Sequence, residues 1–460
     1  MTKTVPAEQL ARYDSVGPRY TSYPTAVDFH AGYGDAEYRA SLDAANRLSS
    51  APLSIYTHIP FCIERCWFCG CHTYATPRHD VVGPYLDHLE IEMERVAALL
   101  PDRRQVAQYH LGGGTPTYLT PDELVRLVRS FQRHFRFLPS AERAIEVDPR
   151  VTTTDHIEAL AGLGFSRISM GVQDFDPDVQ KAIGRKQPVG ATESLVACAR
   201  KNKFQGVNLD LIYGLPRQTQ ETFARTIAQT IALRPDRVAV YSFAYLPNQR
   251  GHQRQIARPA LPERDDKFAL LAVAREGFID AGYQAIGMDH FALPTDELAV
   301  AQRQGRLQRN FMGYTVMAGS DMVGFGVSAI GDVRGALVQD EKKLVQYYRM
   351  LDQGQLPVAR GYQRTADDEI RRDVIHTLMC NFVVDRKLIE EKHGIVFAEY
   401  LRESLAKLAP FIADGMCQID DAGVRAIGLG QVFVRNLAMC FDAHLLPKLS
   451  SKDPVFSRTV

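Results

Sequence analysis

Four of the chain's eight cysteines lie within ten residues, at Cys62, Cys66, Cys69 and Cys71. Their spacing is C-x3-C-x2-C-x-C, and they follow a short apolar run, residues 54–59, that is typical of a β-strand. Thiolates bind soft metals, so thiols gathered in a loop at the end of a strand indicate a metal site. The sequence therefore predicts metal chemistry at this loop.

Two kinds of metal site suit such thiols. A structural zinc site takes four ligands, usually in two pairs with a long gap between them, and a relaxed tetrahedron is difficult when Cys69 and Cys71 are so close. An iron–sulfur cube takes well-spaced cysteines from one loop. Three cysteines, Cys62, Cys66 and Cys69, would leave one iron with an open coordination position, which catalysis can use. The spacing favours the iron–sulfur cluster, with Cys71 as a non-ligand and zinc as the alternative.

Composition excludes several classes of protein. Lys and Arg together number 54 and equal the 54 Asp and Glu, so no charge excess indicates nucleic acid or an acidic membrane surface. The sequence has no apolar run long enough to span a bilayer, and residues 1–6 lack the apolar core of a signal peptide. A cytoplasmic protein is expected. Thiols stay reduced there, which favours metal over disulfide.

The elements that must position this loop form an alternating pattern. Strand-like runs alternate with amphipathic helical stretches, which is the pattern of βαβ units and a parallel sheet. No dinucleotide fingerprint follows the first strand, so a barrel, full or partial, is favoured, with its active site at the carboxyl ends of the strands. The expected strands are 54–59, 105–111, 144–147, 167–170, 207–212, 238–243 and 284–287; the expected helices are 82–100, 121–134, 154–163, 189–203, 219–233 and 265–281.

Three regions are predicted: an arm at 1–50, a catalytic barrel at 51–335 and a mostly helical domain at 336–460. The segment Gly17–Thr25 is rich in Pro, Tyr and hydroxyls, so the arm is expected to be extended, outside the core, and a strap over the site. The last region has helical patterns at 340–353, 366–381, 389–393, 397–407 and 430–441 and a hairpin at 419–427. We expect it to close the open side of the barrel.

The cysteine spacing, with aromatic Phe68 before the third cysteine, resembles the signature of the radical S-adenosylmethionine (SAM) superfamily. The resemblance implies a partial TIM-like (β/α)6 barrel and a [4Fe-4S] cluster on Cys62, Cys66 and Cys69, whose open iron binds SAM. Reduction then releases a 5′-deoxyadenosyl radical. In such enzymes the cofactor supplies the difficult chemistry and the barrel supplies orientation and exclusion of water.

More of the chain resembles one family, the oxygen-independent coproporphyrinogen III oxidases of haem biosynthesis. That resemblance implies oxidative decarboxylation of two propionates of coproporphyrinogen III to vinyl groups, giving protoporphyrinogen IX, with an unidentified electron donor and acceptor. A monomer is expected. The segments that carry the resemblance are 17–26, 56–71, 110–117, 146–150, 171–174, 210–216, 287–292, 309–315, 326–330, 371–381 and 440–442.

The resemblance also implies roles for single residues. The first SAM would contact Tyr56, Gly113, Glu146 and Ile330, and a second SAM would contact Phe68, Gly114, Thr115, Gln173, Arg185, Asp210 and Ala244. Tyr56 and His58 are the candidate catalytic residues. From the residues alone, Gly112–Pro116 fits a ligand cradle that offers N–H donors as well as an ordinary tight turn. Glu146 alone could form a salt bridge, Arg185 and Asp210 could be sheet-end charges, and His58 could be a satisfied sheet-end histidine.

Other interpretations remain open at this point. A haem chaperone branch shares C-x3-C-x2-C, and by resemblance it lacks Cys71 and the Gly17–Thr25 arm. A zinc-stabilised binding protein is a third possibility, whereas G-x-G-x-x-A at 324–329 is only a weak dinucleotide signal. Met312 stands where the family pattern has Gln, and Met cannot donate a hydrogen bond. Arg19, Arg303 and Arg309 are candidate partners of the substrate carboxylates or solvated charges, and Tyr20 and Tyr23 could cover the macrocycle.

Overall fold

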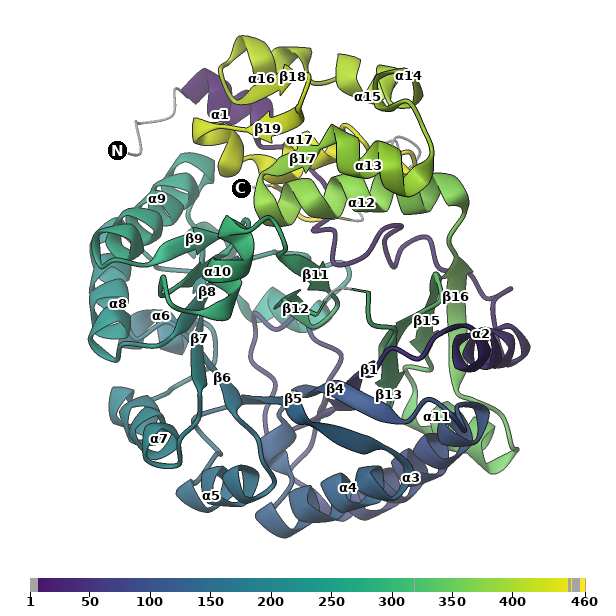
Figure 1. The fold of residues 1–460 in the computed structure, drawn as a ribbon. Helices are drawn as coiled ribbons and strands as arrows, with labels where there is room; N and C mark the ends of the chain where they lie inside the picture. The colour runs from purple at the N-terminus through teal and green to yellow at the C-terminus, as the bar shows by residue number, and fades with distance from the viewer. Residues whose placement is uncertain (1–6, 318, 446–447, 449–455, 460) are drawn as a thin grey trace.

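The computed structural model describes residues 7–317, 319–445, 448 and 456–459. Its centre is a curved sheet in which six parallel neighbours follow one another in chain order (Figure 1). These strands are β1 (Leu53–Ile59), β4 (Gln105–Gly113), β5 (Arg136–Val147), β6 (Arg167–Gln173), β7 (Gly206–Tyr213) and β8 (Arg237–Ser242). Each was predicted, although β5 begins eight residues before the expected start at residue 144.

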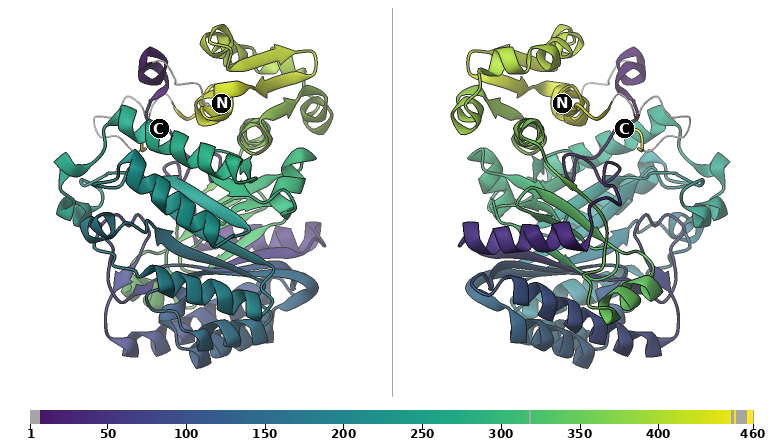
Figure 2. Two further views of the ribbon diagram at one scale, coloured as in Figure 1. Left: turned by 90° about the vertical axis from the view of Figure 1, so that its left-hand side faces the viewer. Right: turned by 90° about the vertical axis from the view of Figure 1, so that its right-hand side faces the viewer.

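The outer face of this sheet is covered by one helix from each repeat (Figures 1 and 2). Amphipathic patterning explains the covering: on α4 the residues Leu124, Leu127, Val128 and Phe131 are buried, and Thr120 caps the helix by accepting from the Glu123 N–H. The six helices are α3 (Val82–Leu99), α4 (Pro121–His134), α5 (Thr154–Gly162), α7 (Val189–Lys201), α8 (Gln220–Ala232) and α9 (Arg264–Asp280). The six predicted β–α repeats are thus confirmed.

Further strands extend the sheet at both edges. β10 (His290–Ala292) and β9 (Gln284–Ile286) add antiparallel pairs beyond β8. On the other side β13 (Met322–Phe325) runs parallel to β1, and three antiparallel strands follow: β14 (Ile330–Val333), β15 (Ala336–Asp340) and β16 (Val358–Gln363). The helix expected at 340–353 is shorter, because Asp340 ends β15 and α11 spans Leu344–Asp352. The division at residue 335 stays a prediction, and the sheet continues past it.

The C-terminal region packs around a second apolar core. Its elements lie between the two ends of the curved sheet, above its mouth in Figure 1. The predicted hairpin is present as β18 (Cys417–Asp420) and β19 (Gly423–Ala426), with β17 (Val383–Asp385) alongside. The helices are α12 (Ala366–Asn381), α13 (Arg386–His393), α14 (Phe397–Tyr400), α15 (Arg402–Ala406), α16 (Ala409–Ala413) and α17 (Val434–Met439).

The N-terminal segment differs from the expected arm. It contains two helices, α1 (Ala7–Tyr13) and α2 (Asp35–Leu48), and α1 lies beside the C-terminal elements (Figure 1). The stretch between them is extended, as predicted, but Tyr20 and Tyr23 are 1% and 0% exposed within the second core. The expectation that this segment stays outside the core was wrong. Buried phenol rings cannot cover a macrocycle in this conformation, so that prediction was wrong as well.

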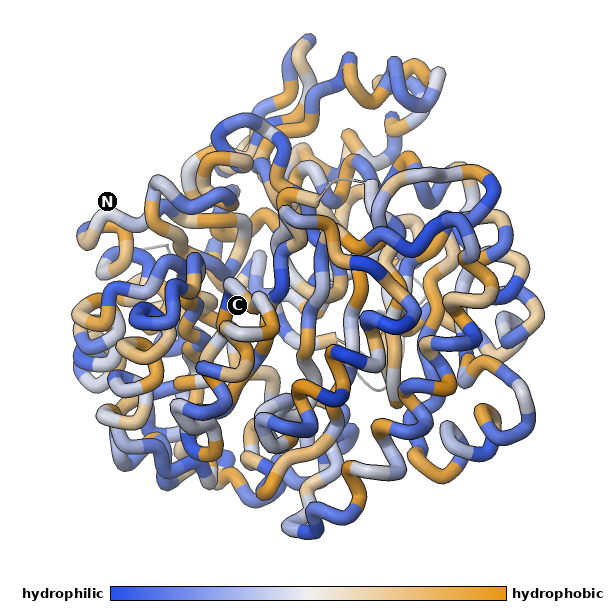
Figure 3. Tube along the Cα trace, turned by 60° about the horizontal axis from the view of Figure 1, so that its bottom comes forward, coloured by the Kyte–Doolittle hydropathy of each residue, from blue (hydrophilic) through white to orange (hydrophobic). Residues whose placement is uncertain are grey.

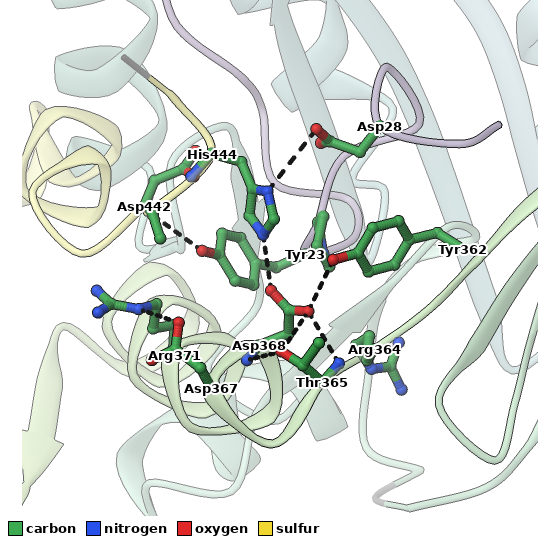
Figure 4. Close-up of polar contacts among 12 residues, drawn as sticks. Tyr23, Asp28, Tyr362, Arg364, Thr365, Asp367, Asp368, Arg371, Asp442 and His444 are labelled. Carbon is green, nitrogen blue, oxygen red and sulfur yellow. Dashed lines mark hydrogen bonds and ion pairs between the residues drawn. The ribbon is translucent and has the colours of Figure 1, made fainter. Parts of the chain in front are cut away.

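Polar contacts fasten this segment to the C-terminal region. Figure 4 shows His444 between Asp28 and Asp368, with Nε2 2.7 Å from an Asp368 carboxylate oxygen and Nδ1 4.0 Å from Asp28. The Tyr23 hydroxyl accepts a 3.0 Å hydrogen bond from the Ala443 N–H, and the Tyr362 hydroxyl donates to Asp368 at 3.0 Å. Segments from both ends of the chain are therefore joined at one place.

Hydropathy is mixed along the whole trace. In Figure 3, short apolar runs alternate with polar ones. In the part of the chain that the structure describes, no helix has the length and apolar content needed to cross a membrane.

Candidate active site

The cysteine loop, residues 62–71, leaves the sheet at the carboxyl end of β1. A short parallel pair, β2 (Phe61–Cys62) and β3 (Tyr74–Ala75), closes the loop at its base. The turn after β4 is bonded to the segment that enters the loop: the Gly114 N–H donates to the Ile59 carbonyl at 2.8 Å and the Thr115 N–H donates to the Phe61 carbonyl at 2.9 Å. The loop is therefore held by two strand ends of the barrel.

The glycines of this turn allow that close approach. A Cβ on Gly114 would lie 2.7 Å from the Pro60 carbonyl oxygen and 2.8 Å from that of Phe61, closer than carbon and oxygen can pack. The N–H of Gly113 donates to Glu146 at 3.1 Å, so the N–H groups of residues 113, 114 and 115 are all engaged within the chain. The expectation that this turn offers N–H donors to a ligand was wrong for these three groups; the glycines serve backbone packing instead.

Two guanidinium groups lie against one of the thiols. Arg150 Nη2 is 3.3 Å and Arg185 Nη1 is 3.4 Å from the Sγ atom of Cys66. Both arginines also pair with Asp148, at 2.7 and 2.9 Å. Arg185 is 5% exposed, so it is neither a surface charge nor a free sheet-end charge. The two guanidinium groups therefore place positive charge beside one of the three cysteines predicted to hold the cluster.

The donor set fits an iron–sulfur cluster better than a single ion. Cys62, Cys66 and Cys69 line one cavity of about 160 Å³, yet within the described residues no three His, Cys, Asp or Glu side chains converge on a single-ion site. Mononuclear zinc needs its sulfurs around one point, whereas each cysteine of a cube binds a different iron. Arg185 lines the same cavity, and its buried Nε has no hydrogen-bond partner among the described residues.

The residues predicted to contact SAM separate into two cavities. The cavity beside the cysteines, here the cysteine cavity, is lined by Phe68, Gly114, Thr115, Gln173, Arg185 and Asp210. A second cavity of about 380 Å³, here the tyrosine cavity, is lined by Tyr56, His58, Gly113, Glu146 and Ile330. Gly113, Glu146 and Cys71 line both, so the two predicted sets lie next to each other.

Ala244 is the exception. It lines neither cavity but a larger one beyond the end of β8. Buried Gln253 links it to the site, because its Nε2 donates to the carbonyl oxygens of both Ala244, at 3.0 Å, and Phe68, at 3.2 Å. A direct contact of Ala244 with a ligand in the cysteine cavity is not part of this geometry.

Tyr56 and His58 form a short chain of hydrogen bonds on β1. His58 Nε2 is 3.0 Å from the carbonyl oxygen of His72 and must donate to it, so Nδ1 accepts from the Tyr56 hydroxyl at 3.0 Å. Burial lowers the pKa of His58 to about 4, which keeps the imidazole neutral at physiological pH. Both ring nitrogens are thus satisfied within the chain, and the Tyr56 ring faces the tyrosine cavity beside Glu146.

Two carboxylates, Glu146 on β5 and Asp210 on β7, lie on either side of β6 and differ in their electrostatics. Glu146 accepts from Gly113 N–H at 3.1 Å and from His110 Nε2 at 3.3 Å, and although its enclosed position opposes ionisation, these partners hold its pKa below the usual range. Burial and then the charge of Glu146 raise the pKa of Asp210 to about 6. Asp210 accepts from Ser169 and Asn208 at 3.0 and 2.7 Å. Neither carboxylate forms a salt bridge with Lys or Arg in the described part of the chain.

The arginines proposed for substrate carboxylates differ in position. Arg303 is exposed and donates to Gln284 and to the Pro294 carbonyl, so its assignment to the site was wrong. Arg309 is 6% exposed and donates to the Arg19 carbonyl at 3.1 Å, while Arg19 donates to the Ser242 carbonyl at 2.8 Å. Met312 lines a further cavity of about 130 Å³ inside the barrel.

Several site residues were missed by sequence reasoning. Asp148 and Arg150 fall within the segment 146–150 that carried the resemblance, yet only Glu146 was given a role. Gln253 and Arg250 lie in the loop after β8, where the sequence has no periodic pattern. Lys342 follows β15 in a stretch predicted as helix. Their positions depend on long-range pairing that a local pattern does not contain.

Comparison with known proteins assigns the chain to a family. The radical SAM superfamily model matches residues 56–229, and the model of the HemN C-terminal domain matches residues 365–433. The oxygen-independent coproporphyrinogen III oxidase of Salmonella typhimurium is 44% identical over 451 residues, which cover 98% of this chain and 97% of the relative. The chain belongs to the oxygen-independent coproporphyrinogen III oxidase family. The relative of the same name from Pseudomonas aeruginosa is 43% identical over 456 residues, covering 99% and 98%.

A solved structure agrees with this membership. Coproporphyrinogen III oxidase (HemN) from Escherichia coli, described as a radical SAM enzyme, matches with 43% identity and a TM-score of 0.90, covering 93% of this chain and 98% of that one. The predicted fold, a partial (β/α)6 barrel with a helical C-terminal region, is confirmed for this oxidase family member. Radical SAM proteins use SAM and one [4Fe-4S] cluster held by three cysteines, so the predicted cofactors are confirmed, whereas the individual residue assignments stay predictions.

Proposed function

We propose that this protein is an oxidoreductase that converts two propionates of coproporphyrinogen III to vinyl groups without oxygen, giving protoporphyrinogen IX. Each propionate loses its carboxyl group as CO2, and the remaining side chain gives up one hydrogen atom and one electron. The strongest support is that the cysteine cavity lies next to the tyrosine cavity. The chain is also 44% identical to an oxygen-independent coproporphyrinogen III oxidase.

In this proposal Cys62, Cys66 and Cys69 hold the [4Fe-4S] cluster. When bound, the cluster and SAM supply the 5′-deoxyadenosyl radical that removes the hydrogen atom. The guanidinium groups of Arg150 and Arg185 offset the negative charge of the Cys66 thiolate. The hydrogen bonds from the turn after β4 to Ile59 and Phe61 fix the point at which the cysteine loop begins.

The tyrosine cavity would receive the first SAM. Glu146 stays ionised near neutral pH and can accept from the amino or ribose groups of SAM. Tyr56 and His58 would orient the reacting groups, and because His58 donates to the His72 carbonyl, it holds Tyr56 in position rather than transferring a proton itself. Gly113 and Ile330 complete the wall of this cavity.

A second SAM would bind in the cysteine cavity, next to the guanidinium group of Arg185 and the carboxylate of Asp210. Phe68, Gly114, Thr115 and Gln173 line the remaining wall, and Ala244 acts only through Gln253. The electron donor and acceptor are separate molecules. We propose that the protein works as a monomer in the cytoplasm.

One anaerobic experiment tests the proposal. The protein is reconstituted with iron and sulfide, reduced, and given SAM and coproporphyrinogen III; protoporphyrinogen IX, CO2 and 5′-deoxyadenosine should form. A brown protein that yields 5′-deoxyadenosine but no decarboxylated product would contradict the substrate. Tight haem binding without vinyl product would indicate a haem chaperone instead, and a colourless preparation that binds zinc would contradict the cluster.

A further inference from the structure

Three cationic side chains lie at the wall of the tyrosine cavity or directly behind it: Arg250 and Lys342 line the cavity, and Arg360 reaches its wall through Gln339. Arg250 lies after β8, and Lys342 lies after β15; both line the cavity. Arg360 lies on β16, and its Nε donates a 2.8 Å hydrogen bond to Oε1 of Gln339, which also lines the cavity. In Figure 1, β8 and β16 are on opposite sides of the arc, so the elements that carry Arg250 and Arg360 are far apart in the sheet.

Two carboxylates, Glu146 and Glu341, lie near these cations, but neither forms an ion pair with them. Within the described residues, none of the three forms an ion pair with Asp or Glu. Glu341 is adjacent, but its Oε1 accepts from the main-chain N–H groups of Lys342 and Lys343. Across the cavity, Glu146 is bonded to His110 and Gly113. Partial burial, followed by repulsion from Arg360 and Arg250, lowers the pKa of Lys342.

The cations are held in place by the surrounding chain. The carbonyl oxygen of Lys342 accepts from Nε2 of His72 at 2.8 Å and from the hydroxyl of Tyr74 at 2.7 Å, which ties it to the end of the cysteine loop. The Arg360 guanidinium lies 5.8 Å from the ring centroid of Phe29. Its Nε is bonded to Gln339, and its guanidinium forms no ion pair with Asp or Glu among the described residues. Like charges gathered around a cavity repel each other unless an anion binds between them.

We propose that Arg250, Lys342 and Arg360 form a carboxylate-binding rim that holds the substrate propionates which are not reacting. The inference rests on the proposed function and adds the residues that recognise the substrate. Coproporphyrinogen III has four propionates, so three carboxylates remain to be neutralised while one reacts, and the rim supplies three cations. Arginine matches a carboxylate with two parallel hydrogen bonds, and lysine acts as a point charge.

Binding of coproporphyrin III, the stable oxidised form of the macrocycle, tests the rim directly. Arg250→Gln, Lys342→Gln and Arg360→Gln should each weaken its binding about 10- to 100-fold, as expected for the loss of one charged hydrogen-bonded contact. The control Lys343→Gln removes the same charge from the neighbouring exposed residue, which does not line the cavity, and should change binding less than about 2-fold. With the tetramethyl ester of coproporphyrin, wild type and variants should bind alike.

The SAM dissociation constant, measured on the same reconstituted proteins, distinguishes the other carboxylate that could occupy the rim. The rim variants should bind SAM like the wild type. If their affinity for SAM falls as much as that for coproporphyrin III, the rim binds the SAM carboxylate and the inference is overturned. Equal coproporphyrin binding by wild type and variants overturns the inference alone. Absence of binding by the wild type overturns both the inference and the proposed function.

Discussion

The hydroxyl of Tyr85 donates a 2.6 Å hydrogen bond to the main-chain carbonyl of His58. The Tyr85 hydroxyl oxygen itself accepts from the Val327 N–H at 3.2 Å, so one buried phenol on α3 joins the end of β1 to the turn that follows β13. Tyr85→Phe should therefore lower the free energy of unfolding by about 2 kcal/mol, since two buried hydrogen bonds are lost. Urea unfolding of the purified chain measures this. Tyr348→Phe, a half-buried ring with no hydroxyl bond among the described residues, should change it by less than about 0.5 kcal/mol; equal losses would contradict the role given to Tyr85.

Gly114→Ala should disrupt the cysteine loop. The added methyl group would collide with the carbonyl oxygens of Pro60 and Phe61 at 2.7 and 2.8 Å, and the backbone must shift to relieve it. We expect a loss of at least about 2 kcal/mol in unfolding free energy and a clear fall in iron bound per chain after reconstitution. Gly70→Ala is the matched control in the same loop, because nothing lies within 4 Å of its Cβ position. Full iron incorporation by Gly114→Ala would show that the close approach is unimportant.

His58 should make stability fall on acidification. Because burial lowers its folded pKa to about 4, the unfolded chain binds more protons between about pH 6.5 and 4, and unfolding free energy rises with pH over this window. His58→Gln should reduce the slope by up to about 1.4 kcal/mol per pH unit. Urea unfolding at pH 4.5, 5.5 and 6.5 measures the slope, and exposed His30→Gln is the control. A slope unchanged in His58→Gln would mean that this imidazole is protonated in the folded protein.

A buried pair of carboxyl groups, Glu92 and Asp340, should make the free energy of unfolding fall as pH rises, which is opposite to the effect of His58. Glu92 on α3 and Asp340 at the end of β15 share a hydrogen bond; burial raises the pKa of Glu92 to about 7 and that of Asp340 well above its usual range. The folded chain therefore holds extra protons, and this contribution to stability is lost as pH rises from about 4.5 through 7. Glu92 accepts from the Gly326 N–H and the Tyr347 hydroxyl, bonds that the oxygen of Gln can keep.

Glu92→Gln should accordingly lose less stability than wild type between pH 5 and pH 8, by on the order of 1 kcal/mol or more. Thermal or urea unfolding at the two pH values provides the comparison. Glu94→Gln, two residues along and exposed, removes a carboxylate without burial and should follow the wild type. If Glu92→Gln and wild type lose stability in parallel, the pair is not protonated in the folded state.

The repeats of the barrel could be predicted because each depends on local periodicity. Helix α4 was predicted with both ends correct, since Thr120 and Pro121 mark its start and its buried residues recur at helical spacing. The sheet edges could not be predicted in the same way. β13 has only four residues, and it pairs with β1, which lies more than 260 residues earlier in the chain. A pattern within a short stretch of sequence cannot indicate such a pairing. The burial of Tyr20 and Tyr23 also depends on residues more than 400 positions away.

In the site, the sequence predicted those features that follow from residue type and local spacing. The thiols of the cysteine loop lie together because their ligand spacing is local. The role of Gly112–Gly114 was only half predicted: a turn with no Cβ atoms was correct, but its N–H groups are bonded to Glu146 and Ile59. Arg185 could not be distinguished from a surface charge, because its partners Asp148 and Cys66 lie 37 and 119 positions away in the chain.

The fastening of Tyr20 and Tyr23 has a consequence for the order in which the protein is completed. The Tyr20 hydroxyl donates to Asp442 and that of Tyr23 accepts from Ala443, so both tyrosines find these partners more than 400 positions later in the chain. While translation is under way, the N-terminal segment cannot dock, although all the strands from β1 to β8 have already been made. A ribosome stalled before residue 440 would therefore present a chain whose barrel sequence is complete and in which the segment around Tyr20 and Tyr23 is still accessible to protease.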